Sequence, residues 1–247
     1  MKFDFKGKVA MVTGASVGIG RAAALKLAEG GAEVALLDVN EEKLKAVQKE
    51  CEAFGVKAKA YRCDVSDEAA VYAVADDITK TFGKVDILVN NAALWRDEGL
   101  FHEIDTKIWE KYMHINVLGT MYCTRSVING MLERGWGRVV NVASVVGVYG
   151  QATAVHYSAT KGAVIAFTKA LAKETSGKGV TVNSIAPGTV SPSNVEDINY
   201  FCENLRNYTG RTGTDAENAA LICFLASEEA AYVSGENILI DGCRKVL

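Results

Sequence analysis

The chain has 247 residues, of which 49% are hydrophobic and 23% are charged. This balance is typical of a folded globular protein and excludes disordered, collagen-like and coiled-coil chains. The 27 basic and 30 acidic residues leave a formal net charge of −3, so no electrostatic feature predicts a nucleic-acid or anionic-membrane partner. Because the chain has only two prolines and no linker-like segment, we expect a single domain over residues 1–247.

The six cysteines include no C-x-x-C pair and have no histidine at metal-ligand spacing. We interpret them as reduced thiols that fill apolar positions, and we expect no metal site and no disulfide framework. The short apolar run near the N-terminus leads straight into a glycine-rich turn, which argues against a signal peptide. No apolar run approaches the roughly 20 residues of a membrane span. The sequence therefore predicts a cytoplasmic protein.

Short β-branched runs alternate along the chain with longer segments of helical period. This pattern is typical of βαβ units around a buried parallel sheet, so we expect an α/β fold. The predicted strands cover residues 8–13, 32–38, 57–63, 85–90, 137–144, 180–186 and 237–241. Helices are predicted in the intervals, among them residues 19–29 and 41–55, each of which ends at a glycine.

Two later helices, over residues 107–133 and 155–176, are predicted to be long. Each has more apolar residues than one core-facing stripe needs, which predicts contact with a second subunit unless both faces are covered within the monomer. Residues 189–213 show no clear period and follow a late strand. We therefore expect this segment to be a substrate lid.

The sequence TGASVGIG follows the first predicted strand and opens the first helix. Glycines let the backbone turn tightly and approach a ligand, and a helix N-terminus offers free N–H groups to a pyrophosphate. A glycine-rich turn without a ligand is the alternative interpretation. The predicted dinucleotide contacts in this loop are Gly14, Ser16, Val17, Gly18, Ile19 and Gly20.

Asp38 ends the second predicted strand, about twenty residues beyond the glycines. A carboxylate at this place can accept hydrogen bonds from both hydroxyls of the adenosine ribose and would repel a 2′-phosphate. Val17 and Val39 stand where a cation could have met that phosphate. The pattern therefore favours NAD over NADP, although a turn or cap aspartate is the alternative for Asp38.

The third and fourth predicted strands run into polar residues at their carboxyl ends, where ligands bind in open α/β sheets. Asp64 can accept a hydrogen bond from the adenine amino group while Val65 packs on the ring. Asn90 is expected to lie beneath the dinucleotide, with Asn91 and Ala92 in contact with it. The alternatives are helix capping by Ser66 or Asp67 and a simple turn at residues 90–91.

Three later residues suggest a reaction. Ser144 ends the fifth predicted strand, and Tyr157 and Lys161 share one helical face because they are four residues apart. A lysine ammonium near a phenol favours the phenolate, so we expect Lys161 to lower the pKa of Tyr157 toward working pH. Tyr157 would then exchange a proton with a substrate oxygen that Ser144 holds by a hydrogen bond.

These motifs resemble the short-chain dehydrogenase/reductase family over nearly the whole chain. The resemblance implies a Rossmann-type, doubly wound parallel sheet of seven strands flanked by helices. It also implies an NAD(P)-dependent oxidoreductase that usually forms a homotetramer, with the two long helices paired across an interface. The motifs are TGASVGIG, Asp64, NNAA, Asn116 in HINVLGT, Ser144, YSATK, NSIAPG and SGENILIDG.

The resemblance also assigns roles. Tyr157 corresponds to the general acid/base, Lys161 to the residue that lowers its pKa and binds the nicotinamide ribose, and Ser144 to the substrate-orienting hydroxyl. Asn116 corresponds to the asparagine whose backbone holds a water between the lysine and solvent, unless it only kinks its helix. Further expected cofactor contacts are Pro187, Gly188 and Val190. Two residues depart from the family pattern, Ala93 in place of glycine and Pro192 in place of threonine.

The sequence thus predicts reversible hydride transfer between C4 of a nicotinamide and the carbon of a secondary alcohol or ketone. Available aromatic residues favour a hydrophobic or cyclic alcohol, such as a hydroxysteroid, unless they pack the lid instead. The alternatives are an NADPH-using reductase like the 3-oxoacyl-(acyl-carrier-protein) reductases and a catalytically idle dinucleotide-binding regulator. The residues expected to line the substrate pocket are Ala93, Trp95, Ser144, Val146, Gln151 and Tyr157.

Overall fold

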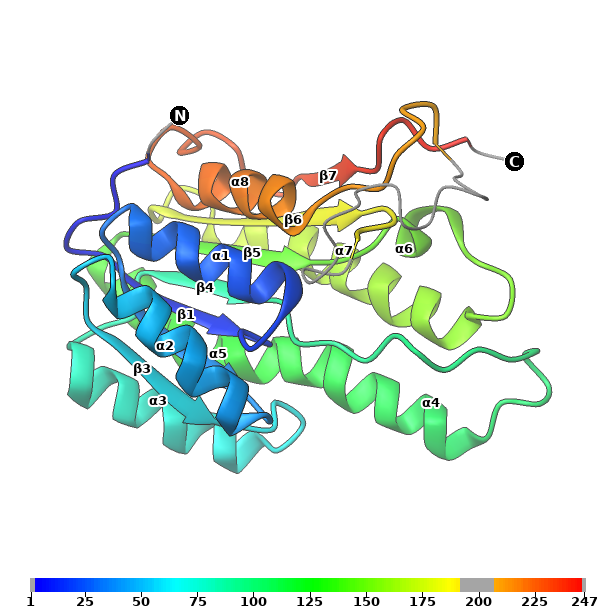
Figure 1. Cartoon of the computed structure of the whole chain (residues 1–247), viewed down its shortest axis with the longest axis horizontal. Coiled ribbons are helices and arrows are strands. Elements are labelled where there is room, and N and C mark those ends of the chain that lie inside the picture. The colour runs from blue at the N-terminus through cyan, green and yellow to red at the C-terminus, as the bar shows by residue number, and fades with distance from the viewer. Residues whose placement is uncertain (1–2, 192–206, 246–247) are drawn as a thin grey trace.

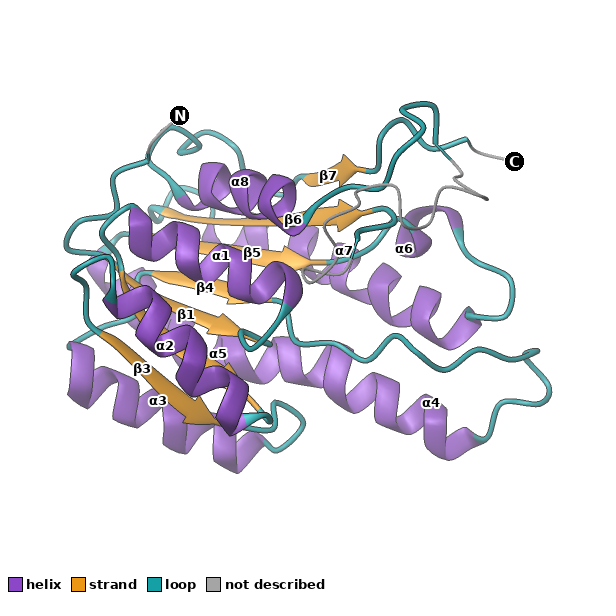
Figure 2. Cartoon of the chain, viewed as in Figure 1, coloured by secondary structure: helices purple, strands orange, loops and turns teal. Residues whose placement is uncertain are grey.

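The computed structural model describes residues 3–191 and 207–245, which contain one parallel sheet of seven strands in the order β3-β2-β1-β4-β5-β6-β7. Figure 2 shows the strands side by side between two layers of helices. All seven predicted strands are present, within two residues at each end. Their bounds are β1 Val9–Thr13, β2 Glu33–Asp38, β3 Ala58–Arg62, β4 Ile87–Asn90, β5 Gly137–Val142, β6 Val180–Pro187 and β7 Asn237–Ile240.

The central strands are buried along their whole length, which explains their nearly continuous apolar sequences. Every residue of β1, β4, β5 and β6 is buried, whereas the edge strands β3 and β7 are partly exposed. A parallel sheet with helices on both faces has no solvent-facing side, so its inner strands cannot alternate between apolar and polar residues. The strand order confirms the predicted doubly wound arrangement.

Two helical layers form the two halves of the core (Figure 1). One layer, packed on the cluster that contains Leu27 and Leu36, consists of α1 (Gly18–Glu29), α2 (Glu41–Glu52) and α8 (Asp215–Ala226). The other, packed around Met11 and Leu88, consists of α3 (Glu68–Phe82), α5 (Gly119–Arg134) and α7 (Val155–Thr175). The short α6 (Val146–Tyr149) lies against α7.

The predicted helix over residues 107–133 is not a regular α-helix. It consists of α4 (Thr106–Tyr112), the π-helical turn η1 (Met113–Leu118) and α5. The hydroxyl of Thr120 donates to the backbone carbonyl of Asn116 at 2.9 Å, and the Asn116 side chain bonds outside the helix. A π-turn inserts one extra residue without changing the apolar character of the segment, so hydrophobic period alone does not reveal it.

The loop between α7 and β6 gives a test of the packing at the amino end of the sheet. Gly177 and Gly179 both have φ +76°, but only at Gly179 would an added Cβ collide, at 1.9 Å from the carbonyl oxygen of Gly135. We expect Gly177→Ala to cost about 1–2 kcal/mol for the left-handed conformation alone. Gly179→Ala should cost about 1–3 kcal/mol more, because the neighbouring loop must move.

Chemical denaturation of the two variants measures the difference. The matched backbone angles make Gly177→Ala the control for conformational strain. Equal losses of stability in the two variants would contradict the close approach of these loops.

Candidate active site

The hydroxyl of Thr13 joins the ends of β1 and β4, where the direction of strand progression reverses. It accepts hydrogen bonds from the backbone N–H groups of Asn91 (2.9 Å) and Ala92 (3.0 Å). It also donates to the carbonyl of Val89 at 3.4 Å. Ligands bind in open α/β sheets at this topological switch point, so these contacts shape the floor of the candidate site.

The glycine-rich loop rests on the Asn91 side chain. Its Nδ2 donates to the carbonyl oxygens of Thr13 (3.1 Å) and Gly14 (3.0 Å). A Cβ at Gly14 would lie 2.7 Å from that nitrogen, and a Cβ at Gly20 would lie 2.2 Å from the carbonyl oxygen of Gly14. The two glycines are therefore required by the packing of the loop itself.

Helix α1 begins directly after this loop and has no side-chain cap at its N-cap residue, Val17, and no acidic residue in its first turn. By contrast, α2, α3, α4 and α8 each begin at a side chain that accepts a hydrogen bond from the first turn. The free N–H groups and the positive end of the helix dipole thus remain available to an anion. This cradle fits the pyrophosphate of a dinucleotide.

Asp38 fixes two neighbouring turns with its carboxylate. Its Oδ2 accepts from the backbone N–H of Ser16 at 3.1 Å, and its Oδ1 accepts from that of Asn40 at 2.9 Å. The structural role considered for Asp38 is therefore present, and the ribose contact stays a prediction. The side chains of Val17 and Val39 beside it are 50% and 60% exposed. These two uncharged side chains offer apolar surface to a base or a sugar.

The residues after β3 are only partly arranged as the sequence suggested. Asp64 accepts hydrogen bonds from both the backbone N–H and the hydroxyl of Ser66, and Asp67 caps α3. Val65 is buried in the core, where it lies against Gly119. Its side chain has little surface left for an adenine ring, and that contact stays a prediction.

Lys161 is buried beneath the end of β5. Its Nζ donates to the carbonyl oxygen of Val142 at 2.7 Å and lies 5.8 Å from the centroid of the Tyr157 ring. Burial lowers the pKa of Lys161 to about 8. The ammonium therefore gives up its proton far more readily than an exposed lysine does.

The expected lowering of the Tyr157 pKa by Lys161 stays a prediction. Burial raises this pKa to about 12, while a hydrogen bond with Ser144 acts in the opposite direction. The raised pKa of Tyr157 favours the neutral phenol, and the lowered pKa of Lys161 favours loss of its proton.

Ser144, Tyr157 and Lys161 nevertheless meet at one place, as their spacing suggested. Ser144 follows β5 in a turn in which the backbone N–H of Val146 donates to its Oγ at 3.4 Å. Tyr157 and Lys161 lie one turn apart on α7. The fourth residue, Asn116, is buried on η1, and its amide contacts the backbone of Leu94 and the hydroxyl of Thr160.

The residues proposed to line the substrate pocket differ widely in exposure. Trp95 is 61% exposed and stacks under the Arg96 guanidinium, whereas Val146 is buried. Gln151 donates from its backbone to the Ser158 hydroxyl, and Ala93 is partly exposed. His156, next to Tyr157 on α7, is buried against the rings of Trp109 and Tyr112.

The proposed lid lies mostly outside the described residues, including Pro192 at its start. The described parts of its two ends meet: Val190 pairs with Gly213, and the backbone N–H of Ser191 donates to the carbonyl of Gly213. Before the lid, Pro187 ends β6 and Gly188 donates to Ile240.

Several contributing residues escaped sequence reasoning. Thr13, Thr160 and Tyr112 are all buried, and Tyr112 accepts a hydrogen bond from the backbone N–H of Asp97 at 2.9 Å. Two of these residues lie in recognised motifs, Thr13 at the start of TGASVGIG and Thr160 inside Y-x-x-x-K. Within the described ranges, no helix is long and apolar enough to cross a membrane, and no cluster of three metal-ligating side chains occurs.

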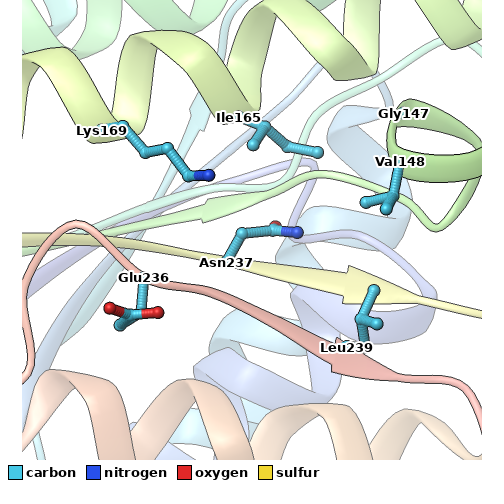
Figure 3. A pocket seen from close by; sticks show the side chains of 7 residues that line it. All are labelled: Gly147, Val148, Ile165, Lys169, Glu236, Asn237 and Leu239. Carbon is cyan, nitrogen blue, oxygen red and sulfur yellow. The ribbon is translucent and has the colours of Figure 1, made fainter.

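A cavity of about 270 Å³ lies away from these residues, between α6, α7 and β7. Figure 3 shows Ile165 and Lys169 from α7 on one side and residues of the β7 segment on the other. None of the predicted catalytic residues lines it. Its lining consists of Gly147, Val148, Ile165, Lys169, Glu236, Asn237 and Leu239.

Comparison with known proteins agrees with this geometry. A family model described as short chain dehydrogenase matches residues 8–201. The 3-oxoacyl-(acyl-carrier-protein) reductase of Aquifex aeolicus is 38% identical over 248 residues, which cover 98% of this chain and 99% of that protein. The 2-dehydro-3-deoxy-L-rhamnonate dehydrogenase (NAD(+)) of a Sphingomonas species is 40% identical, with coverage of 97% and 96%.

A solved structure, NAD+-bound xylitol dehydrogenase, superposes with a TM-score of 0.88 at 32% identity and covers 96% of this chain and 99% of its own. The chain therefore belongs to the short-chain dehydrogenase/reductase family, which confirms the resemblance drawn from its motifs. It is an oxidoreductase of a family that uses nicotinamide dinucleotides.

The burial of Lys161 leads to a pH-dependent stability. Its pKa is about 8 in the folded protein and 10.5 for an ordinary lysine, so between these values the unfolded chain binds more protons. The free energy of unfolding therefore rises as pH increases from about 8 to 10.5, and this gain is lost as pH falls back through the folded pKa of about 8. Relative to Lys161→Met, the wild-type protein should gain about 1–2 kcal/mol between pH 7.5 and 9.5.

Denaturant unfolding of both proteins across this pH range provides the measurement. Parallel stability curves would show that the amine is not desolvated as the structure indicates.

Proposed function

We propose that this protein is an NAD-dependent dehydrogenase that interconverts a secondary alcohol and its ketone. Two observations carry the proposal: Ser144, Tyr157 and buried Lys161 converge after β5, and the uncapped N-terminus of α1 follows β1 at the same edge of the sheet. Ser144, Tyr157 and Lys161 can bind a substrate oxygen and exchange a proton with it, and the N-terminus of α1 can bind a pyrophosphate.

The residues of the switch point are suited to bind the dinucleotide. The glycine-rich loop and the first turn of α1 would hold the pyrophosphate, and Asp38 the adenosine ribose. Lys161, Asn91 and Gly188 are the expected contacts near the nicotinamide end. When bound, the dinucleotide supplies the carbon centre that accepts or donates a hydride.

The chain's own residues supply the proton and the placement. Tyr157 is protonated at neutral pH and can donate its hydroxyl proton to a ketone oxygen that Ser144 also holds. In alcohol oxidation the deprotonated oxygen of Tyr157 must take the proton of the alcohol, which requires that one proton first leave the Tyr157–Lys161 pair. Because Lys161 titrates near 8, we expect alcohol oxidation to speed up as pH rises through that value.

NAD is the proposed cofactor because Asp38 places a carboxylate next to the glycine-rich loop, and the exposed Val17 and Val39 beside it carry no charge. Two relatives have NAD in their names or titles, the rhamnonate dehydrogenase and the xylitol dehydrogenase. The second candidate is an NADPH-using 3-oxoacyl reductase. It is favoured by the several curated relatives that are 3-oxoacyl-(acyl-carrier-protein) reductases.

A hydrophobic or cyclic alcohol is the proposed substrate. Exposed apolar side chains lie on the segments that flank the site, after β4 and around α6: Trp95, Leu100, Phe101, Val148 and Tyr149. Large exposed apolar groups near a binding site favour a ligand with apolar surface. We further propose a homotetramer in the cytoplasm, as the family resemblance implies. Tyr232 and Leu239, which are exposed on and before β7, are available for subunit contact.

A nicotinamide-absorbance assay tests the reaction. Wild-type protein is assayed with NAD and with NADP against steroid, cyclic, polyol and hydroxyacyl alcohols. We expect turnover with NAD on at least one hydrophobic or cyclic alcohol, and a loss of at least about 100-fold in Tyr157→Phe because its proton donor is gone. Dinucleotide binding should persist in the variant. Binding without turnover across the panel would support the idle-regulator alternative, and turnover with NADP alone would overturn the cofactor assignment.

A charge-matched pair of variants tests the role of Asp38. Asp38→Ser should lower kcat/KM for NAD by about ten-fold or more and raise the relative preference for NADP, because the carboxylate that repels a 2′-phosphate is removed. Glu42→Gln removes one negative charge from the exposed start of α2 and should leave the preference unchanged. An equal change in both variants would indicate a general charge effect.

A further inference from the structure

The side-chain amide of Asn116 forms two hydrogen bonds with the backbone of Leu94, in the segment that follows β4. Its Oδ1 accepts from the backbone N–H of Leu94 at 2.8 Å, and its Nδ2 donates to the carbonyl oxygen of Leu94 at 3.0 Å. Both hydrogen-bonding groups of the Leu94 backbone are therefore paired with one buried side chain. Leu94 lies between Ala93 and Trp95, two residues proposed to contact the substrate.

The same amide also reaches the helix that bears Tyr157. Its Nδ2 donates to Oγ1 of Thr160 at 3.1 Å, and Thr160 is fully buried on α7. The Thr160 hydroxyl in turn donates to the backbone carbonyl of Tyr157 at 2.8 Å. A continuous path of hydrogen bonds thus joins Leu94, Asn116, Thr160 and Tyr157.

The donors and acceptors along this path allow one arrangement. The single hydroxyl hydrogen of Thr160 is committed to the Tyr157 carbonyl, so its oxygen can only accept from Asn116. The amide must then direct Nδ2 at Thr160, and its Oδ1 faces the N–H of Leu94. Loss of the Thr160 hydroxyl would leave a buried N–H group with one partner fewer and would release the amide from α7.

We propose that Thr160 is a positioning residue that fixes the substrate-contacting segment Ala93–Trp95 relative to Tyr157, acting through the Asn116 side chain. The role in substrate placement rests on the proposed function. The bridge, by which we mean the hydrogen bonds from Leu94 through Asn116 and Thr160 to Tyr157, does not depend on it. Misplacement of a substrate-contacting segment by a fraction of an ångström lowers the fraction of bound alcohol in a reactive position. The effect should grow with the size of the alcohol, because larger substrates touch more of this segment.

A matched control lies on the same helix. Thr168 is also fully buried, donates to the backbone carbonyl of Val164 at 2.8 Å and accepts from Nδ2 of Asn141 at 2.9 Å. Its hydrogen bonds have the same form as those of Thr160, but they lead into the sheet and not to Leu94. Thr168→Val should therefore reproduce the general cost of losing a buried hydroxyl.

The experiment compares Thr160→Val, Thr160→Ser and Thr168→Val by amide hydrogen exchange and steady-state kinetics. In Thr160→Val we expect exchange at the Leu94 amide to accelerate by about ten-fold or more. For a bulky cyclic alcohol, kcat/KM should fall by about ten-fold, with a smaller loss for a small alcohol and unchanged NAD affinity. Thr160→Ser should stay within about three-fold of wild type, and Thr168→Val should change neither readout.

Unchanged Leu94 exchange in a folded Thr160→Val protein would overturn the proposal. An acceleration of equal size in Thr168→Val would also overturn it, since the effect would then be a general loosening of α7. If the wild-type protein oxidises no alcohol at all, the proposed function fails, and the exchange comparison still decides whether the bridge holds Leu94.

Discussion

The site depends on the parallel pairing of β4 with both β1 and β5. In this register Val12 lies beside Val89, and Asn90 lies beside Asn141. The three strands therefore end at one edge of the sheet, where Thr13 and Asn91 fasten the glycine-rich loop and Ser144 follows β5. A shift of one residue in this register would turn side chains to the opposite face of the sheet. The hydrogen bonds of Thr13 and Asn91 to the loop would then be lost, and Ser144 would be displaced.

Burial then sets the chemistry of the residues collected at this edge. Helix α7 carries Lys161 beneath the end of β5, where the backbone carbonyl of Val142 accepts a hydrogen bond from its Nζ. Removal from water lowers the pKa of the lysine and raises that of Tyr157. After these two shifts Tyr157 holds its proton more tightly than Lys161 does. A pair of protonated lysine and phenolate would require the opposite order. In the proposed reaction Tyr157 would therefore begin as a proton donor, and Lys161 would control how readily the pair loses a proton.

Much of this arrangement is predictable from the sequence, because it follows from local patterns. Apolar β-branched runs identified all seven strands, and the glycine-rich turn, Asp38 and the Y-x-x-x-K motif fell at the strand and helix ends where an α/β fold places ligands. The π-turn at Met113–Leu118 was not predictable, since its apolar period continues that of the flanking helices. The pKa of Tyr157 and the link from Asn116 to Thr160 depend on burial and on contacts between segments far apart in the chain.

The central claim is that an alcohol and a nicotinamide exchange a hydride directly at the Ser144–Tyr157–Lys161 site. The most direct measurement uses an alcohol substrate deuterated at its carbinol carbon and follows the label by mass spectrometry of the reduced dinucleotide. The account predicts one deuterium in the reduced dinucleotide from the labelled alcohol in ordinary water, and none when unlabelled alcohol reacts in heavy water. Deuterium acquired from heavy water, or lost from the labelled alcohol to solvent, would contradict direct transfer.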